Sequence, residues 1–193
     1  MCVITGIDYS ISCPCLCVYT DNKPLSFENV SFYFNQESIT KKEQSRRKTL
    51  EFPNIFWSER FLTSNDEQRY YYLADWALSI CLERHIDIAI LEAYALGAQG
   101  RVFNIAEATG LLKHYLFRTG IQIVTYPPTF NKKSFSGKGN ANKEKMIDTF
   151  NQKNKINIAE SMGYKSDYFG SPISDIVDSY SLIDTFLKER TKL

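Results

Sequence analysis

Histidine is scarce in this chain of 193 residues, which has only His85 and His114. The five cysteines are an odd number, and Cys13, Cys15 and Cys17 alternate along an extended segment instead of forming the Cys-x-x-Cys pairs of a zinc knuckle. A structural zinc site is therefore not expected. The alternating thiols would instead lie on one face of a strand and pack in the core as reduced cysteines.

Long apolar runs are also missing. The chain has no stretch of ~18 apolar residues, and its N-terminus has no basic segment followed by an apolar one. We therefore expect a soluble, cytoplasmic protein with no membrane partner. A hydrophobic content of 44% suits one well-filled core, which predicts a single domain over residues 1–193. Residues 35–65 form an insertion of uncertain fold. The Asn-, Lys- and Tyr-rich composition of the chain would fit a viral or AT-rich source, and in the viral case the host cytoplasm.

The formal net charge of +1 does not by itself indicate whether the protein binds a polyanion such as nucleic acid. The charges are nevertheless segregated: residues 41–48 hold five basic residues against one acid, and residues 131–155 hold seven lysines against two acids. Two basic patches on a neutral chain suit a protein that grips a polyanion on one face, although each patch could also be a solvated loop.

Two apolar, β-branched stretches end in an acid. Residues 3–8 lead to Asp8 and residues 86–92 lead to Glu92, and both patterns predict buried strands. Neighbouring strands lie about 4.8 Å apart, so paired strands would bring the two carboxylates close enough to share a metal ion. Either acid alone would more often be a solvated strand-end residue.

The remaining pattern predicts an α/β fold. Strands over 15–19 and 25–34 would complete an antiparallel meander, and a helix that begins at a Ser64–Glu67 capping box would cross over to the Glu92 strand, making that strand a parallel neighbour of the first. The other predicted elements are a helix over 100–118, a strand over 121–126 ended by Pro127-Pro128, a helix over 140–151 capped by Asn140, and a helix over 171–189 with a Ser171 cap and Pro172 in its first turn. The expected sheet has five strands, three antiparallel and then parallel, flanked by helices.

The last helix carries a pair of acids, Asp175 and Asp178, three residues apart. This spacing places them on one face with a rise of about 4.5 Å. Two acids that repel each other close to the sheet favour a bound cation, unless both face water. Four oxygen donors with almost no histidine favour Mg²⁺ or Mn²⁺ over zinc, and two such ions about 3.5 to 4 Å apart can support phosphodiester hydrolysis.

The order of these elements resembles the RNase H-like fold, and the local motifs resemble the RuvC family of Holliday-junction resolvases. The matching stretches are Gly6-Ile7-Asp8, Leu91-Glu92, residues 104–110, Tyr126-Pro127-Pro128 with Lys132, residues 137–143 and residues 174–178. The resemblance implies a magnesium-dependent endonuclease with two ions per active site, for which Mn²⁺ can substitute. It also implies a homodimer that resolves four-way DNA junctions or other branched DNA.

By this resemblance, the metal-binding acids fall on Asp8, Glu92, Asp175 and Asp178, and two active-site lysines fall on Lys132 and Lys143. Lys133, Lys138 and Lys145 could equally lie near phosphate, but Lys143 is favoured because the first turn of a capped helix fixes it. Tyr94 is the nearest candidate for the family's junction-stacking aromatic residue, and it could instead pack on the core.

The helix over 100–118 is the candidate dimer interface, by resemblance and by pattern. One stripe of this helix would be lined by Val102, Phe103, Ala106, Gly110 and Lys113, among which Ala106 and Gly110 are small enough to let two helices approach. The stripe could alternatively pack on the sheet.

Three other functions remain open. A ribonuclease H acting on RNA-DNA hybrids would use the same chemistry. An actin-like ATPase is disfavoured because no glycine-rich phosphate loop follows Asp8. A non-catalytic DNA-binding module is disfavoured by the four acids.

Overall fold

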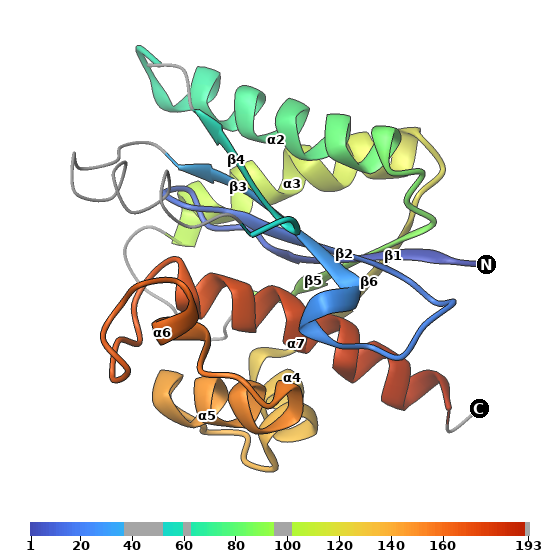
Figure 1. The fold of residues 1–193 in the computed structure, drawn as a ribbon. Helices are drawn as coiled ribbons and strands as arrows, with labels where there is room; N and C mark the ends of the chain where they lie inside the picture. Colours follow the sequence, from blue (N-terminus) through green and yellow to red (C-terminus); the bar gives the residue numbers. More distant parts are fainter. Residues whose placement is uncertain (37–51, 60–62, 95–101, 192–193) are drawn as a thin grey trace.

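The computed structural model describes residues 1–36, 52–59, 63–94 and 102–191. Its centre is a six-stranded sheet in the order β4-β3-β2-β1-β5-β6 (Figure 1). The strands are β1 (Val3–Asp8), β2 (Cys15–Thr20), β3 (Val30–Gln36), β4 (Ile55–Glu59), β5 (Ile88–Glu92) and β6 (Gln122–Tyr126). The basic stretch 41–48 lies outside the described residues.

The pairing of the strands confirms the predicted mixed sheet. β1, β2 and β3 form an antiparallel meander, β5 runs parallel to β1, and β6 runs parallel to β5. The prediction of five strands is wrong, because β4 arises within the 35–65 insertion and pairs in parallel with β3. Pro53 and the polar stretch before it obscure this strand in the sequence, and its pairing partner lies some twenty residues away.

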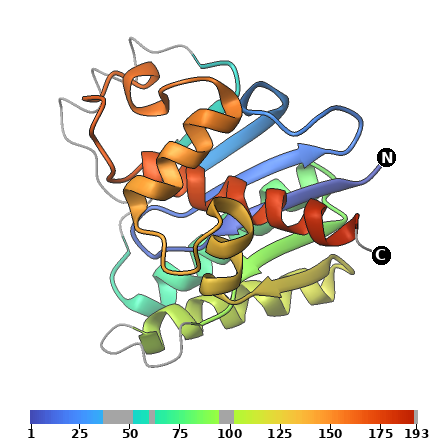
Figure 2. The ribbon, with the colours of Figure 1, turned by 90° about the horizontal axis from the view of Figure 1, so that it is seen from below.

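Helices cover both faces of the sheet (Figure 1). α2 (Asp66–Glu83) and α3 (Val102–Arg118) pack on one face, and Figure 2 shows the others in front of the opposite face. Those others are α4 (Pro128–Ser136), α5 (Lys143–Asn154), α6 (Ile158–Ser161) and α7 (Ile173–Arg190). Of the helices in the described ranges, none is long and apolar enough to cross a bilayer.

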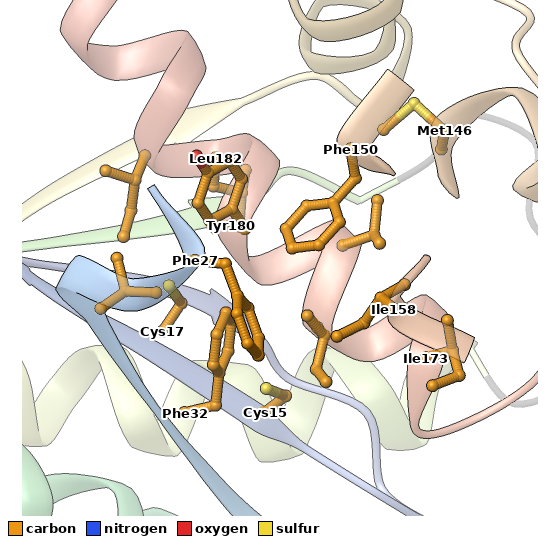
Figure 3. Close-up of a cluster of buried hydrophobic side chains, with 14 of the residues drawn as sticks. Cys15, Cys17, Phe27, Phe32, Met146, Phe150, Ile158, Ile173, Tyr180 and Leu182 are labelled. Atoms are coloured by element: carbon orange, nitrogen blue, oxygen red, sulfur yellow. The ribbon is translucent and has the colours of Figure 1, made fainter. Parts of the chain in front are cut away.

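The core on the α7 side is rich in aromatic side chains (Figure 3). Phe150 of α5 meets Tyr180 of α7 edge to face, with ring centroids 4.9 Å apart. Cys13, Cys15 and Cys17 are buried in this layer as reduced thiols, which confirms that these thiols pack in the core.

Two helices begin one or two residues away from their predicted caps. Asn65 caps α2 in place of Ser64, since its side chain accepts a hydrogen bond of 2.9 Å from the backbone N–H of Gln68. Asn142 caps α5 in place of Asn140. Each segment offers several residues that can cap, and the path of the entering chain decides which of them does so.

The prolines also act differently from the prediction. Pro172 occupies the N-cap position of α7, whose first residue is Ile173, and the Ser171 hydroxyl bonds to Asp175 instead of capping the helix. Pro127-Pro128 ends β6 as predicted, but Pro128 also begins α4, a helix that the polar sequence did not indicate.

Strand β3 is shorter at its start than predicted, because a single 3-10 turn, η1 (Phe27–Asn29), precedes it.

α7 lies directly on β1 at Gly6. A Cβ atom at Gly6 would stand 2.1 Å from the backbone oxygen of Ser179, so only a residue without a side chain permits this approach. Asp8 follows two residues later on the same face of the strand. The close contact therefore brings Asp8 alongside the neighbouring α7 residue, Asp178.

Candidate active site

Three acids from three elements line one pocket. Asp8 ends β1 and Glu92 ends β5, and because Ile7 pairs with Leu91 the two acids are the next residues along the parallel register. Asp178 of α7 lines the same pocket, which has a volume of about 350 Å³. The structure thus brings together side chains that are far apart in the sequence.

Asp175, the fourth predicted ligand, lies behind this pocket. Its side chain is 9% exposed and accepts hydrogen bonds from the hydroxyls of Ser171 and Ser174. It stands in the first turn of α7, where the positive end of the helix dipole favours an anion. Asp175 is therefore held in place by its own hydrogen bonds, whereas the other three acids face the pocket.

Burial raises the pKa values of Asp8, Asp178 and Glu92, and repulsion from neighbouring carboxylates adds to this for Asp8 and Asp178. Burial raises the pKa of Asp8 well above its ordinary value, and the charges of Asp178, Asp175 and Glu92 raise it further. Burial, then Glu92 and Asp175, raise the pKa of Asp178 to about 7. Burial also raises the pKa of Glu92, while a hydrogen bond from Asn131 and the charge of Lys132 oppose that rise. The site thus concentrates negative charge that a cation would neutralise.

Two of the five candidate lysines act on these acids. Lys132 of α4 favours the ionised forms of Glu92 and Asp178, and Lys143 favours those of Asp8 and Asp178, in each case by lowering the pKa. Lys143 is the first residue of the capped helix α5, as the sequence indicated.

The other three candidates are placed differently. Lys133 on α4 and Lys138 on the loop after it are exposed, and Lys145 is half-buried on α5. Their positions on the same segment suit contact with a polyanion outside the pocket.

The acid set has the donor chemistry for a hard divalent cation, which prefers carboxylate oxygens. Asp8, Glu92 and Asp178 would hold it, because they line the pocket. Asp175 does not line the pocket and is hydrogen-bonded to Ser171 and Ser174. Among the described residues, no three His, Cys, Asp or Glu side chains already form a coordination group. Binding would therefore require small side-chain rotations, which relief of the mutual repulsion would favour.

Asp178→Asn should stabilise the metal-free protein at high pH. A carboxyl whose pKa rises from 3.8 to about 7 on folding binds more protons folded than unfolded, so its charge destabilises the fold above pH 7 and not below pH 4. At pH 8 with EDTA, we expect a gain of at least about 1 kcal/mol, or about 2 to 4 °C in Tm. The gain should disappear near pH 4 in thermal unfolding experiments.

The exposed acid Asp148 on α5 supplies the control. Asp148→Asn should leave Tm unchanged between pH 4 and pH 8, and saturating Mg²⁺ should cancel the advantage of Asp178→Asn. A loss of stability in Asp178→Asn at pH 8 would contradict the repulsion described here.

Tyr94 lies at the mouth of the pocket. Its side chain is 42% exposed and its hydroxyl donates to the backbone oxygen of Ala106 at 3.3 Å, while the ammonium group of Lys113 stands 5.2 Å from its ring centre. Tyr94 therefore does not pack in the core, which was one of the two alternatives predicted for it. The ring is placed beside the acids, where it could stack on a ligand.

α3 presents part of its predicted stripe outward: Phe103 and Gly110 are exposed, whereas Val102 lines the acid pocket, and Ala106 and Lys113 lie against Tyr94. Phe103 and Phe117 are each 77% exposed, and a Cβ atom at Gly110 would meet nothing within 4 Å. The opposite side of α3 is the one that packs in the core, through Ala108, Leu112 and Leu116. Phe117 was not among the predicted stripe residues, although its spacing of seven from Gly110 continues the pattern.

Asn131 is a site residue that the sequence interpretation missed. It lies in the lysine-rich stretch 131–155, where an asparagine looks like part of a solvated loop. In the structure it is fully buried on α4 and donates a hydrogen bond to Glu92. No motif in the sequence signals this, since its burial depends on how α4 packs.

Comparison with known proteins gives matches in structure alone. No family model and no curated protein sequence matches this chain. The structure of RuvC from Thermus thermophilus superposes with a TM-score of 0.60 at 15% identity, covering 98% of this chain and 97% of that one. The T. thermophilus RuvC in complex with a Holliday junction substrate gives 0.63 at 16% identity, covering 100% of this chain and 97% of that one. The predicted RNase H-like architecture is confirmed in its RuvC-like form.

Proposed function

We propose, on the premise of this RuvC-like fold, that the protein is a metal-dependent endonuclease that cuts four-way DNA junctions. The observation that carries the proposal is the meeting of Asp8, Glu92 and Asp178 in one pocket with Asp175 behind them. A non-catalytic DNA-binding module would have no reason to hold acids whose charges repel one another and would repel DNA.

The four acids would hold two Mg²⁺ ions, with Mn²⁺ able to replace them; Asp175 would join the other three by turning from the Ser171 and Ser174 hydroxyls toward the pocket. When bound, the ions would lower the pKa of an attacking water and neutralise charge on the scissile phosphate. The protein fixes the ligands on rigid elements: two parallel strand ends and one helix that Gly6 lets approach closely. Lys143 and Lys132 would offset the negative charge that develops on phosphate oxygens in the transition state.

Junction resolution needs two matched cuts, so a chain with one site would act as a two-fold dimer. We place the interface on the α3 face formed by Phe103, Ala106, Gly110, Lys113 and Phe117, without Val102 of the predicted stripe, since Val102 lines the acid pocket. Spacings of three and four residues keep this face on one side of the helix, and Gly110 in its middle lets a second helix approach.

A cleavage assay with three substrates tests the function. Labelled four-way junction, RNA-DNA hybrid and linear duplex are incubated with the protein and Mg²⁺. We expect paired nicks in opposing strands of the junction and negligible cutting of the duplex. Preferred cleavage of the hybrid would instead establish a ribonuclease H, and no cleavage with either Mg²⁺ or Mn²⁺ would overturn the proposal.

Lys143→Ala and Lys133→Ala should have different effects. Because Lys143 acts on the site carboxyls, its loss should slow single-turnover cleavage about 100-fold with little change in junction affinity. Lys133 is exposed on the neighbouring helix, so its loss should weaken binding and reduce the salt slope of log K by about 0.9 without changing the rate at saturation. If both changes weaken affinity equally and neither changes the rate, then Lys133 and Lys143 only bind DNA and Lys143 has no catalytic role.

A further inference from the structure

The side chain of Asn131 is enclosed where α4 packs on α7, and it reaches the end of β5 through Glu92. It is 0% exposed, and it lies beside the acids and not in the aromatic part of the core. A buried amide that lacks hydrogen-bond partners destabilises a fold, so its contacts indicate what keeps it there. Its partners are Glu92 on β5 and Ser181 and Thr185 on α7.

The neighbouring hydroxyls determine which atoms of the Asn131 amide donate and which accept. The Thr185 hydroxyl donates to Asn131 Oδ1 at 2.8 Å, which fixes Nδ2 on the other side of the amide. The Ser181 hydroxyl donates to the backbone oxygen of Asp178 at 2.8 Å, so its oxygen accepts from Asn131 Nδ2, also at 2.8 Å. The second Nδ2 hydrogen then points to Glu92 Oε1 at 3.3 Å.

The network therefore begins at Thr185 on α7, the helix that also carries Asp175 and Asp178, and ends at the Glu92 carboxylate on β5. It holds one oxygen of Glu92, a residue that lines the pocket. A neutral amide is suited to this task, because a lysine or arginine donor would bring a positive charge that competes with a cation. We infer that Asn131 is a positioning residue that fixes the Glu92 carboxylate for metal binding, an inference that rests on the metal-ligand role proposed for Glu92.

The test measures Mn²⁺ binding to the whole protein from the free-Mn²⁺ signal in electron paramagnetic resonance. Partners that orient a ligating side chain are typically worth about 10- to 100-fold in metal affinity. We expect Asn131→Ala to weaken Mn²⁺ binding about tenfold and to raise the Mg²⁺ concentration needed for half-maximal cleavage by a similar factor, with junction affinity in EDTA unchanged.

Asn154 on α5 provides a matched control. Its side chain also makes three hydrogen bonds, two of them to other elements (the Phe27 N–H and the Tyr180 hydroxyl) and one to the Phe150 carbonyl of α5 itself, and none of them to a site residue. Asn154→Ala should lower Tm as Asn131→Ala does and leave Mn²⁺ affinity unchanged. An equal loss of Mn²⁺ affinity in both variants would show that general loosening of the fold is the cause, and would overturn the inference.

Thr185→Val keeps the test decisive if Asn131→Ala does not fold. The substitution preserves shape and removes the hydroxyl that orients the amide, so Mn²⁺ binding should weaken by a smaller factor, and Thr185→Ser should restore it. Unchanged Mn²⁺ affinity in Thr185→Val would contradict the positioning role.

Glu92→Gln separates this inference from the proposed function. If Glu92→Gln weakens Mn²⁺ binding while Asn131→Ala and Thr185→Val do not, the metal site stands and the positioning role fails. If Glu92→Gln also binds Mn²⁺ normally, the proposed metal site itself fails.

Discussion

Asp8→Asn is expected to slow junction cleavage at least about 1,000-fold while leaving junction binding intact. Asp8 ends β1 in the middle of the acid cluster, and Asp178, Asp175 and Glu92 all act on it electrostatically. An amide at this position keeps the shape of the side chain but loses the anionic oxygen that a divalent ion requires.

Two further readouts make the result specific. Without metal, Asp8 is a like charge near phosphate, worth about 1 kcal/mol at 4 Å even at the dielectric constant of water, so Asp8→Asn should bind junction equally or up to about fivefold more tightly in EDTA. The variant should also be at least as stable as the parent at pH 8, because it lacks the charge whose burial, and then repulsion by the neighbouring acids, raise the pKa of Asp8.

The exposed acid Asp75, on α2 at the opposite face of the sheet, supplies the control. Asp75→Asn should cleave and bind like the parent. Rates are measured under single turnover with enzyme in excess, and affinities by fluorescence anisotropy. An Asp8→Asn variant that still cuts at close to the parental rate would refute the assignment of the site.

Gly110→Arg is expected to convert the protein into a monomer that nicks a junction without resolving it. Gly110 lies midway between the exposed rings of Phe103 and Phe117, at the point where a second helix would come closest. An arginine there would hold the partner helix away and place two like charges across the two-fold axis. Because a Cβ atom at Gly110 meets nothing in the monomer, the fold itself should tolerate the change.

Sedimentation velocity measures the oligomeric state, and a junction held in a plasmid cruciform distinguishes single from paired cuts. Gln152→Arg, which adds the same charge on an exposed position of α5, should remain dimeric and produce paired cuts. A parent protein that is monomeric at micromolar concentration with junction bound would overturn the proposed dimer, and would favour a nuclease acting on flaps or hybrids.

Several parts of this fold could be predicted because local chemistry decides them. An apolar stretch that ends in an acid predicted β1 with Asp8 and β5 with Glu92, and the helical crossover predicted their parallel pairing. The spacing of Asp175 and Asp178 placed both on one helix. The strand and acid-pair patterns each span fewer than about ten residues, the range over which side-chain periodicity acts, and the crossover follows from a general rule of chain topology.

The parts that were missed depend on contacts between distant segments. Strand β4 exists through its pairing with β3, and its own residues do not distinguish it from the loop before it. Phe117 has a large apolar side chain of the kind usually found in a core. Only the packing of the opposite side of α3 in the core shows that Phe117 is exposed.

The sequence by itself determined which residues carry charge to the ends of two strands and to one helix of this protein. The tertiary structure alone decided how the helices join the two strand ends: α7 approaches β1 closely because Gly6 has no side chain, and Asn131 contacts Glu92 because α4 packs on α7. The reason is physical. Periodicity and capping act along the chain, whereas burial, repulsion between carboxylates and the partners of a buried amide depend on which surfaces come together in space.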